Sequence, residues 1–250
     1  MQLSLLLFAA IFLISLLLTM VGLGGGLIFS PLFIILGFPK SVAASASLFL
    51  NLIAAGSAAY TYARKRMVDF PLSIPLIISS SLAAPAGAYL NAQLDLKPFL
   101  IVMAVVLALA GLRMLFTPAQ EEQNSLKTSN KVLGGIGIGA CIGLLGGLLG
   151  IGGGVFVVPL LIYMLKTPTK IAAASSTFIV CFSSLTGFLG YVSMQAVNWW
   201  FILPAAAASF AGGQAGARIM STRIKGRTVR IIFSCILFLF CAKLLHKYFT

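Results

Sequence analysis

Long apolar runs separated by short polar or basic stretches fill almost the whole chain. Apolar runs of about 18 residues or more are typical of helices that cross a bilayer. The pattern predicts five helical segments in each half, at residues 3–21, 26–36, 41–63, 71–92 and 98–116, and at 131–149, 154–165, 169–193, 199–220 and 228–247. The second segment of each half is too short to cross a core of roughly 30 Å, so we expect a broken or re-entrant helix there.

The two halves of the chain repeat each other. The run Gly22–Gly26 recurs 128 residues later as Gly150–Gly154, inside an equally apolar stretch. Further pairs, at an offset of 128 or 129 residues, are Pro31 and Pro159, Pro39 and Pro168, Tyr62 and Tyr191, Pro75 and Pro204, and Gly87 and Gly216. A duplicated hydrophobic unit that glycine and proline break at equivalent positions indicates a transporter with a binding site near the bilayer midplane. The repeat predicts a first transmembrane unit at 1–116, a linker at 117–130 and a second unit at 131–250.

Composition supports a membrane protein. Hydrophobic residues make up 60% of the 250 positions, charged residues make up 8%, and the mean hydropathy is +1.09. So few charges could not cover a soluble domain of this size. We therefore expect an all-α polytopic protein of the cell (inner) membrane with eight to ten membrane segments. The first 20 residues lack the basic start of a secretory signal, so they are expected to remain as the first helix.

The positive charges indicate orientation. The net charge is +13, and the lysines and arginines lie at segment ends, which argues against a nucleic-acid-binding face. Arg64–Met67 is strongly basic, whereas the equivalent Ser193–Ala196 is uncharged; conversely, Arg218–Arg230 carries five basic residues and its equivalent, residues 91–97, is nearly neutral. Opposite bias in equivalent loops predicts two inverted-topology repeats, with both termini external and the linker 117–130 cytoplasmic.

Several kinds of chemistry are missing. The four acidic residues lie at loops or in the linker, so no carboxylate is expected at the midplane for a proton relay or a sodium site. No nucleotide, cofactor or metal motif is recognisable, so we expect no enzyme, no cofactor and no metal site. Asp69 and Asn198 each precede a helix and are expected to be N-caps. The four cysteines lie in apolar runs and are expected to be small buried hydrophobes.

The repeated motifs carry a family resemblance. The first half contains GLGGGLIFSP, VAASASLF and VDF, and the second contains GIGGGVFVVP, IAAASSTF and VNW. Together they resemble the TauE/SafE family of sulfite and organosulfonate exporters, along essentially the whole chain. The resemblance implies a multi-span permease for small sulfur-containing anions, acting outward by alternating access around a midplane site between the repeats. A small anionic substrate and the lipid bilayer are then the expected partners, and homo-oligomerisation is left open.

The glycine motifs are also the candidate binding elements. Helix N-termini present unpaired N–H groups and a positive dipole end to anions, and glycine lets a ligand approach the backbone. Ser47 and Asn51 share one helix face, and the second half has hydroxyls at equivalent depth. The predicted substrate-binding residues are Gly24, Gly25, Gly26, Gly152, Gly153, Gly154, Ser47, Asn51, Ser175, Ser176, Thr177 and Gln214.

These features also have plainer interpretations. Motif glycines can serve close helix packing, which is expected for glycines 134, 135, 137, 139, 143, 146 and 147. Serine and threonine can bond back to their own helix. Arg218 is either the inner end of a helix or a cation that guides anions inward. The functional alternatives are a thiosulfate-type importer, an intramembrane thiol enzyme using Cys181, and a passive anion channel.

Overall fold

The structure is a computed structural model that describes residues 2–95, 128–163, 167–194 and 199–223, and isolated positions between 101 and 112 and between 228 and 242. In the continuous ranges every regular element is a helix. The helices are α1 (Gln2–Val21), α2 (Gly26–Ile35), α3 (Lys40–Arg64), α4 (Phe70–Gln93), α6 (Thr128–Leu149), α7 (Gly154–Tyr163), α8 (Thr169–Val192) and α9 (Trp199–Arg223).

Eight predicted segments are confirmed with boundaries close to those expected. The largest differences are at α6, which begins at Thr128 inside the predicted linker, and at α9, which ends at Arg223 rather than at residue 220. The predicted segments 98–116 and 228–247, and linker residues 117–127, lie outside the continuously described ranges. The short second segment of each half is confirmed, because α2 and α7 each have 10 residues.

Helix starts follow the local sequence. Pro39 and Pro168 precede α3 and α8 with nearly identical backbone angles, φ −54° and ψ 143° or 139°. Asp69 is the predicted N-cap of α4, since its Oδ1 accepts a hydrogen bond from the Leu72 N–H at 3.3 Å. Asn198 lies outside the described residues.

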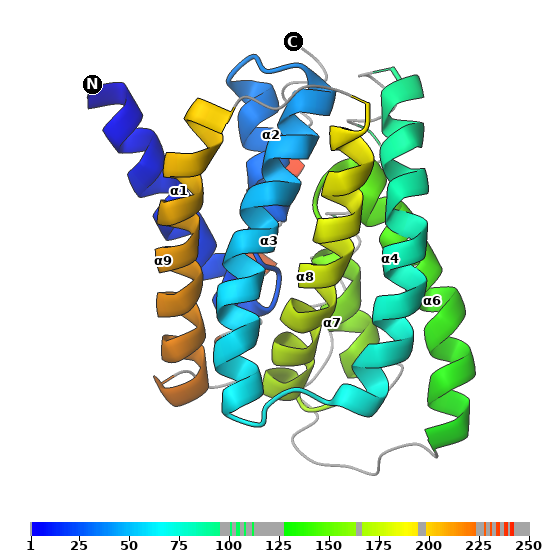
Figure 1. Ribbon diagram of the computed structural model, residues 1–250. Coiled ribbons are helices and arrows are strands. Elements are labelled where there is room, and N and C mark those ends of the chain that lie inside the picture. Colours follow the sequence, from blue (N-terminus) through cyan, green and yellow to red (C-terminus); the bar gives the residue numbers. More distant parts are fainter. Residues whose placement is uncertain are drawn as a thin grey trace.

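The helices pack in pairs, and the repeat offset relates each pair in one part of the bundle to an equivalent pair in the other. α1 packs against α9 and α6 against α4, while α3 and α8 form the centre; α2 packs on α3 and α7 on α8. Each of the six long helices runs in the direction opposite to its counterpart in the other half (Figure 1). Opposite helix directions are a requirement of inverted repeats, whose topology in the membrane stays a prediction. The central α3–α8 pair brings the two halves into contact.

The surface of the bundle is apolar where lipid would lie. Among the described residues, α3, α4 and α8 are long and apolar enough to cross a membrane. Large side chains project outward along the helices, including Leu82, which is 78% exposed, and Trp200, which is 93% exposed. The central helices instead bury alanine, serine and glycine, which lets their backbones approach closely.

Most of the packing glycines behave as expected. A Cβ at Gly139, Gly143 or Gly147 would collide with α4, and one at Gly146 would lie 2.5 Å from Gly153 N. The expectation of close packing is wrong for Gly137, because a Cβ there would meet nothing within 4 Å. The side-chain surroundings of glycines 134 and 135 are not described. Among the described glycines of α6, close packing against α4 is therefore found at Gly139, Gly143 and Gly147.

Membrane orientation can be tested with two loops that lie at opposite ends of the bundle (Figure 1). In a variant without the native cysteines, Arg66→Cys should react with a membrane-impermeant maleimide only from the cytoplasmic side, because the positive-inside rule retains basic loops there. Ser193→Cys should react only from outside. Labelling of both cysteines from the same side would contradict the inverted topology.

Candidate functional site

Two glycine loops break the chain inside the bundle. Five of their glycines have left-handed backbone angles: φ is +89° at Gly22, +77° at Gly24, +68° at Gly150, +71° at Gly152 and +82° at Gly153. Glycine adopts such angles without steric cost, whereas other residues rarely do. These turns end α1 and α6 and allow α2 and α7 to begin deep within the protein. We call the two loops, Gly22–Gly26 and Gly150–Gly154, the glycine junction.

The junction is packed backbone against backbone. A Cβ at Gly26 would lie 2.8 Å from the Ile151 carbonyl oxygen, and one at Gly154 would lie 3.1 Å from Leu23 Cα. The first glycine of each loop is as confined, since a Cβ at Gly22 would lie 2.5 Å from Ala173 Cα in α8. The two halves of the protein therefore touch through their main chains, with no space for a side chain.

Asn51 connects the two loops. It lies near the middle of α3 and is fully buried. Its Oδ1 accepts hydrogen bonds from the N–H groups of Gly25 and Gly26, the latter at 2.9 Å, so it caps the N-terminus of α2. Its Nδ2 donates to Ser184 Oγ at 2.7 Å and to the Ile151 carbonyl at 3.4 Å. One amide thus satisfies groups in both halves.

Two serines form matching bonds across the halves. Ser47 Oγ, on α3, lies 2.7 Å from the Gly150 carbonyl and 3.0 Å from that of Gly26. Ser176 Oγ, on α8, donates to the Gly22 carbonyl at 2.7 Å. The repeat offset exchanges Ser47 with Ser176 and Gly150 with Gly22, so the two bonds are equivalent. We call the Ser47–Gly150 and Ser176–Gly22 contacts the cross-repeat serine bonds.

Three predicted site residues have partners away from the junction. Ser175 Oγ accepts from the Asp69 N–H at 2.9 Å, at the turn that precedes α4. Thr177 bonds back to the Ala173 carbonyl of its own helix at 2.9 Å. Gln214 accepts from Thr61 at 2.6 Å, ten residues and therefore about 15 Å along α3 from Asn51. The other nine predicted residues meet at the junction.

Two junction residues were missed by the sequence analysis. Ser183 Oγ donates to the Gly152 carbonyl at 2.7 Å, and Ser184 accepts from Asn51. They follow Ser176 by seven and eight residues, a spacing that places residues on one helical face. That spacing was the available signal. Their equivalents in the first half are Ala54 and Ala55, so repeat pairing could not reveal them.

The junction is polar but carries no charged side chain. Its donors and acceptors are backbone groups, hydroxyls and one amide, with α2 and α7 starting at its centre. In the described part of the chain, the N–H groups of Gly153 and Gly154 meet no acceptor, whereas Asn51 occupies the equivalent donors of α2. The positive ends of two helix dipoles therefore face a neutral environment, which suits an anion.

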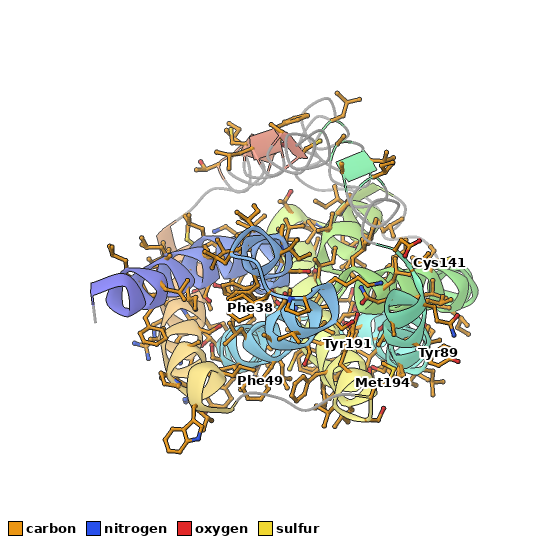
Figure 2. All side chains as sticks on the ribbon, turned by 90° about the horizontal axis from the view of Figure 1, so that it is seen from above. Phe38, Phe49, Tyr89, Cys141, Tyr191 and Met194 are labelled. Carbon is orange, nitrogen blue, oxygen red and sulfur yellow. The ribbon has the colours of Figure 1, made fainter. Side chains whose placement is uncertain are left out.

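Cysteine chemistry does not converge on the junction. Cys181 is partly buried, and a Cβ at Gly56 of α3 would touch its sulfur at 3.5 Å. The expectation of four buried cysteines is wrong for Cys141 and Cys235, which are exposed, and Figure 2 shows Cys141 at the rim of the bundle. Among the described residues no three His, Cys, Asp or Glu side chains cluster in a way that could hold a metal.

Comparison with known families adds to this geometry. A model of the family described as sulfite exporter TauE/SafE matches residues 7–244. The chain belongs to the TauE/SafE family. It is therefore a membrane transporter, and membership favours transport over enzymatic activity.

Curated relatives of the chain carry transporter names. The probable membrane transporter protein YunE of Bacillus subtilis is 26% identical over 92% of each chain. A probable membrane transporter protein of Haemophilus influenzae is 25% identical over 89% of this chain and 87% of its own. A probable membrane transporter protein of Xylella fastidiosa (strain Temecula1) is 26% identical over 82% of this chain and 80% of its own. No solved structure matches this TauE/SafE chain.

Proposed function

We propose that the chain carries a small sulfur-containing oxyanion, such as sulfite or a sulfonate, outward across the cell membrane by alternating access around the glycine junction. The observation that carries the proposal is the meeting of two helix N-termini and their glycine loops at a neutral, hydroxyl-lined point in the bundle. The sulfur substrate and the outward direction come from the family description, sulfite exporter.

The donors of α2 already hold an oxygen. Asn51 Oδ1 accepts from both Gly25 and Gly26, so these N–H groups are directed at one oxygen position. An oxyanion that displaced this amide would find the same donors, and its negative charge would be stabilised by the dipole end. Backbone donors avoid the cost of burying a full cation in the membrane. Asn51 then acts as a neutral substitute for the substrate when the site is empty.

The cross-repeat serine bonds suggest how access alternates. Ser47 lies seven residues after the start of α3 and Ser176 seven after the start of α8, and these helices run in opposite directions. The two bonds therefore flank Asn51 on opposite sides. Breaking one bond would open the junction toward one membrane face while the other bond keeps the opposite face closed. Each bond contributes about 1 kcal/mol, so either can break thermally.

Flux through reconstituted vesicles tests this function. We expect saturable transport of sulfite or an organosulfonate, with sulfate, chloride and thiosulfate carried more slowly. Unlabelled substrate on the opposite side should accelerate uptake of labelled substrate, since a carrier shows counterflow and a passive channel does not. A variant without the four cysteines should keep its flux, which would exclude thiol chemistry. Transport of neutral or cationic solutes alone would contradict the proposal.

A further inference from the structure

A second polar site lies at the end of the bundle where the basic loop Arg64–Met67 is found. A pocket of about 660 Å³ opens there between the last turns of α3 and α9. Its wall contains three cations, Arg64, Lys65 and Arg218, and four neutral polar residues, Tyr60, Thr61, Gln214 and Thr222. It is separated from Asn51 by the length of α3 between residues 51 and 61, about 15 Å.

The pocket is held in shape by neutral partners. Thr61 donates to Gln214 Oε1 at 2.6 Å across the two helices, which leaves the Gln214 amide N–H groups without an acceptor among the described residues. Lys65 donates to Ser221 at 2.7 Å, and Arg64 lies over the Tyr60 ring, 5.7 Å from its centroid. These contacts place Arg64 and Lys65 beside the pocket wall.

The positive charge of the pocket is not neutralised within the described residues. The described part of the chain contains two carboxylates, Asp69 and Asp95. Neither lies in the pocket wall, and neither forms an ion pair with Arg64, Lys65 or Arg218. Guanidinium groups bind oxyanions through paired N–H donors, and an ammonium adds a point charge. Three cations and a free amide around one hollow therefore match a ligand with several negatively charged oxygens.

The opposite end of the bundle provides an internal comparison. The repeat offset relates Lys65 to Met194 and Arg218 to Tyr89, and Figure 2 shows Met194 and Tyr89 at the rim of that end. The equivalents of Thr61 and Gln214 are Gly190 and Pro85, which pack directly, since a Cβ at Gly190 would lie 3.1 Å from Pro85 Cα. At the equivalent positions of this second pair of helix ends there is thus no arginine or lysine, and Gly190 and Pro85 close the space between the helices.

Helix termini alone do not explain this difference. Cations stabilise the last turn of a helix, but α4 and α8 end without any basic residue in that turn. The positive-inside rule accounts for basic residues on one membrane side, but it does not require them to surround a hollow. The difference between the two ends of the bundle therefore indicates a ligand that binds on one face of the membrane only.

We propose that the α3–α9 pocket is a second oxyanion-binding site, distinct from the glycine junction, at the membrane face of the Arg64–Met67 loop. Its ligand is an oxyanion that arrives either as a free solute, such as sulfite or sulfate, or as the phosphate of an anionic lipid headgroup. The free-solute case rests on the proposed function, because it would load the transported anion; the lipid case does not.

The test removes two of the cations. In Arg64→Gln/Arg218→Gln the pocket keeps its shape, because both side chains are exposed and Thr61 and Gln214 are unchanged. The matched control is Arg66→Gln/Lys170→Gln, which removes the same charge at the same end of the bundle, outside the pocket wall. Gln214→Glu is a further variant, which replaces the amide N–H donors inside the pocket by a negative charge and should weaken anion binding.

Two measurements separate the sources of the anion. Titration of purified protein with sodium sulfite and sodium sulfate is made in an Asn51→Asp background, which is designed to block the junction. Retention of phosphatidylglycerol is measured by native mass spectrometry after extraction from phosphatidylcholine vesicles with and without that lipid. The pocket variants should bind one of these probes roughly tenfold more weakly than the control, with an effect that shrinks at high salt.

Each outcome decides the proposal. A selective loss of sulfite or sulfate binding supports a free anion, and a selective loss of phosphatidylglycerol supports a lipid headgroup. Equal binding in pocket and control variants, or an equal loss in both, would overturn the pocket as a site. Failure of the proposed function is seen separately, as absence of anion flux in the wild-type protein.

Discussion

Replacing Gly153 by leucine should abolish anion flux. Gly153 has φ +82°, a region that costs an L-residue roughly 1–2 kcal/mol, and a Cβ there would lie 2.5 Å from Ile142 Cγ2 and 2.9 Å from the Ile142 carbonyl oxygen. The side chain must therefore move the loop that positions the first N–H groups of α7. Sulfite flux in vesicles should fall to background, while size-exclusion chromatography still shows a monodisperse protein.

Other substitutions separate the junction from simple packing. Gly137→Leu, one helix earlier, adds the same side chain into open space and should keep wild-type flux. Gly143→Leu meets the Ser80 backbone and should weaken folding instead of selectively removing binding. In Gly25→Leu the new side chain would meet the buried Phe29 ring rather than backbone, and φ at Gly25 is −157°, so we expect a smaller loss of flux than in Gly153→Leu.

The serines provide a scale for these losses. Ser47→Ala and Ser176→Ala each remove a hydrogen bond of a serine hydroxyl. Each should weaken the free energy of substrate binding by about 1–2 kcal/mol. Flux that survives Gly153→Leu but disappears in the serine variants would show that the site lies on the hydroxyl-bearing helices rather than on the glycine loops.

Replacing Asn51 by aspartate should block anion binding at the glycine junction almost completely. The substitution preserves the shape and the oxygen that Gly25 and Gly26 meet, but it adds a negative charge at the start of α2. A second anion about 4 Å away would be repelled by about 4 kcal/mol at an effective dielectric constant of 20. Since 1.4 kcal/mol is a factor of ten, the affinity for sulfite should fall about a thousandfold. Calorimetric titration of the purified variant measures this change, with Arg64→Gln/Arg218→Gln present in both proteins so that the α3–α9 pocket does not contribute.

A matched substitution controls for the buried charge itself. Asn91→Asp also introduces a carboxylate at a fully buried asparagine, but near the end of α4, where the Lys40 amine bonds to the Asn91 backbone carbonyl. Its sulfite affinity should stay within a few-fold of wild type. Unchanged affinity in Asn51→Asp would remove Asn51 and the start of α2 from the substrate path.

The sequence predicted the elements well because their causes are local. Apolar runs set the helix lengths, Pro39 and Pro168 mark helix starts, and Asp69 caps α4 as its position before Phe70-Pro71 suggested. The sequence also predicted most residues of the glycine junction, because a glycine run inside an apolar segment has few uses other than a turn or a close contact. Ser175, Thr177 and Gln214 were assigned by depth alone, and depth does not fix which way a side chain points.

The sequence by itself thus predicted the repeated glycine motif, the helix boundaries and the correspondence between the two halves. It did so through hydrophobic periodicity and through residues with restricted backbone geometry. Three things depended on the tertiary structure: Asn51 joining both loops, Ser183 and Ser184 belonging to the junction, and the hollow between α3 and α9. Each arises from contacts between separate helices and loops, such as Asn51 with Ser184, 133 positions apart, and Ser183 with Gly152, 31 positions apart. Such contacts follow from how helices pack, which the pattern along a single helix does not specify.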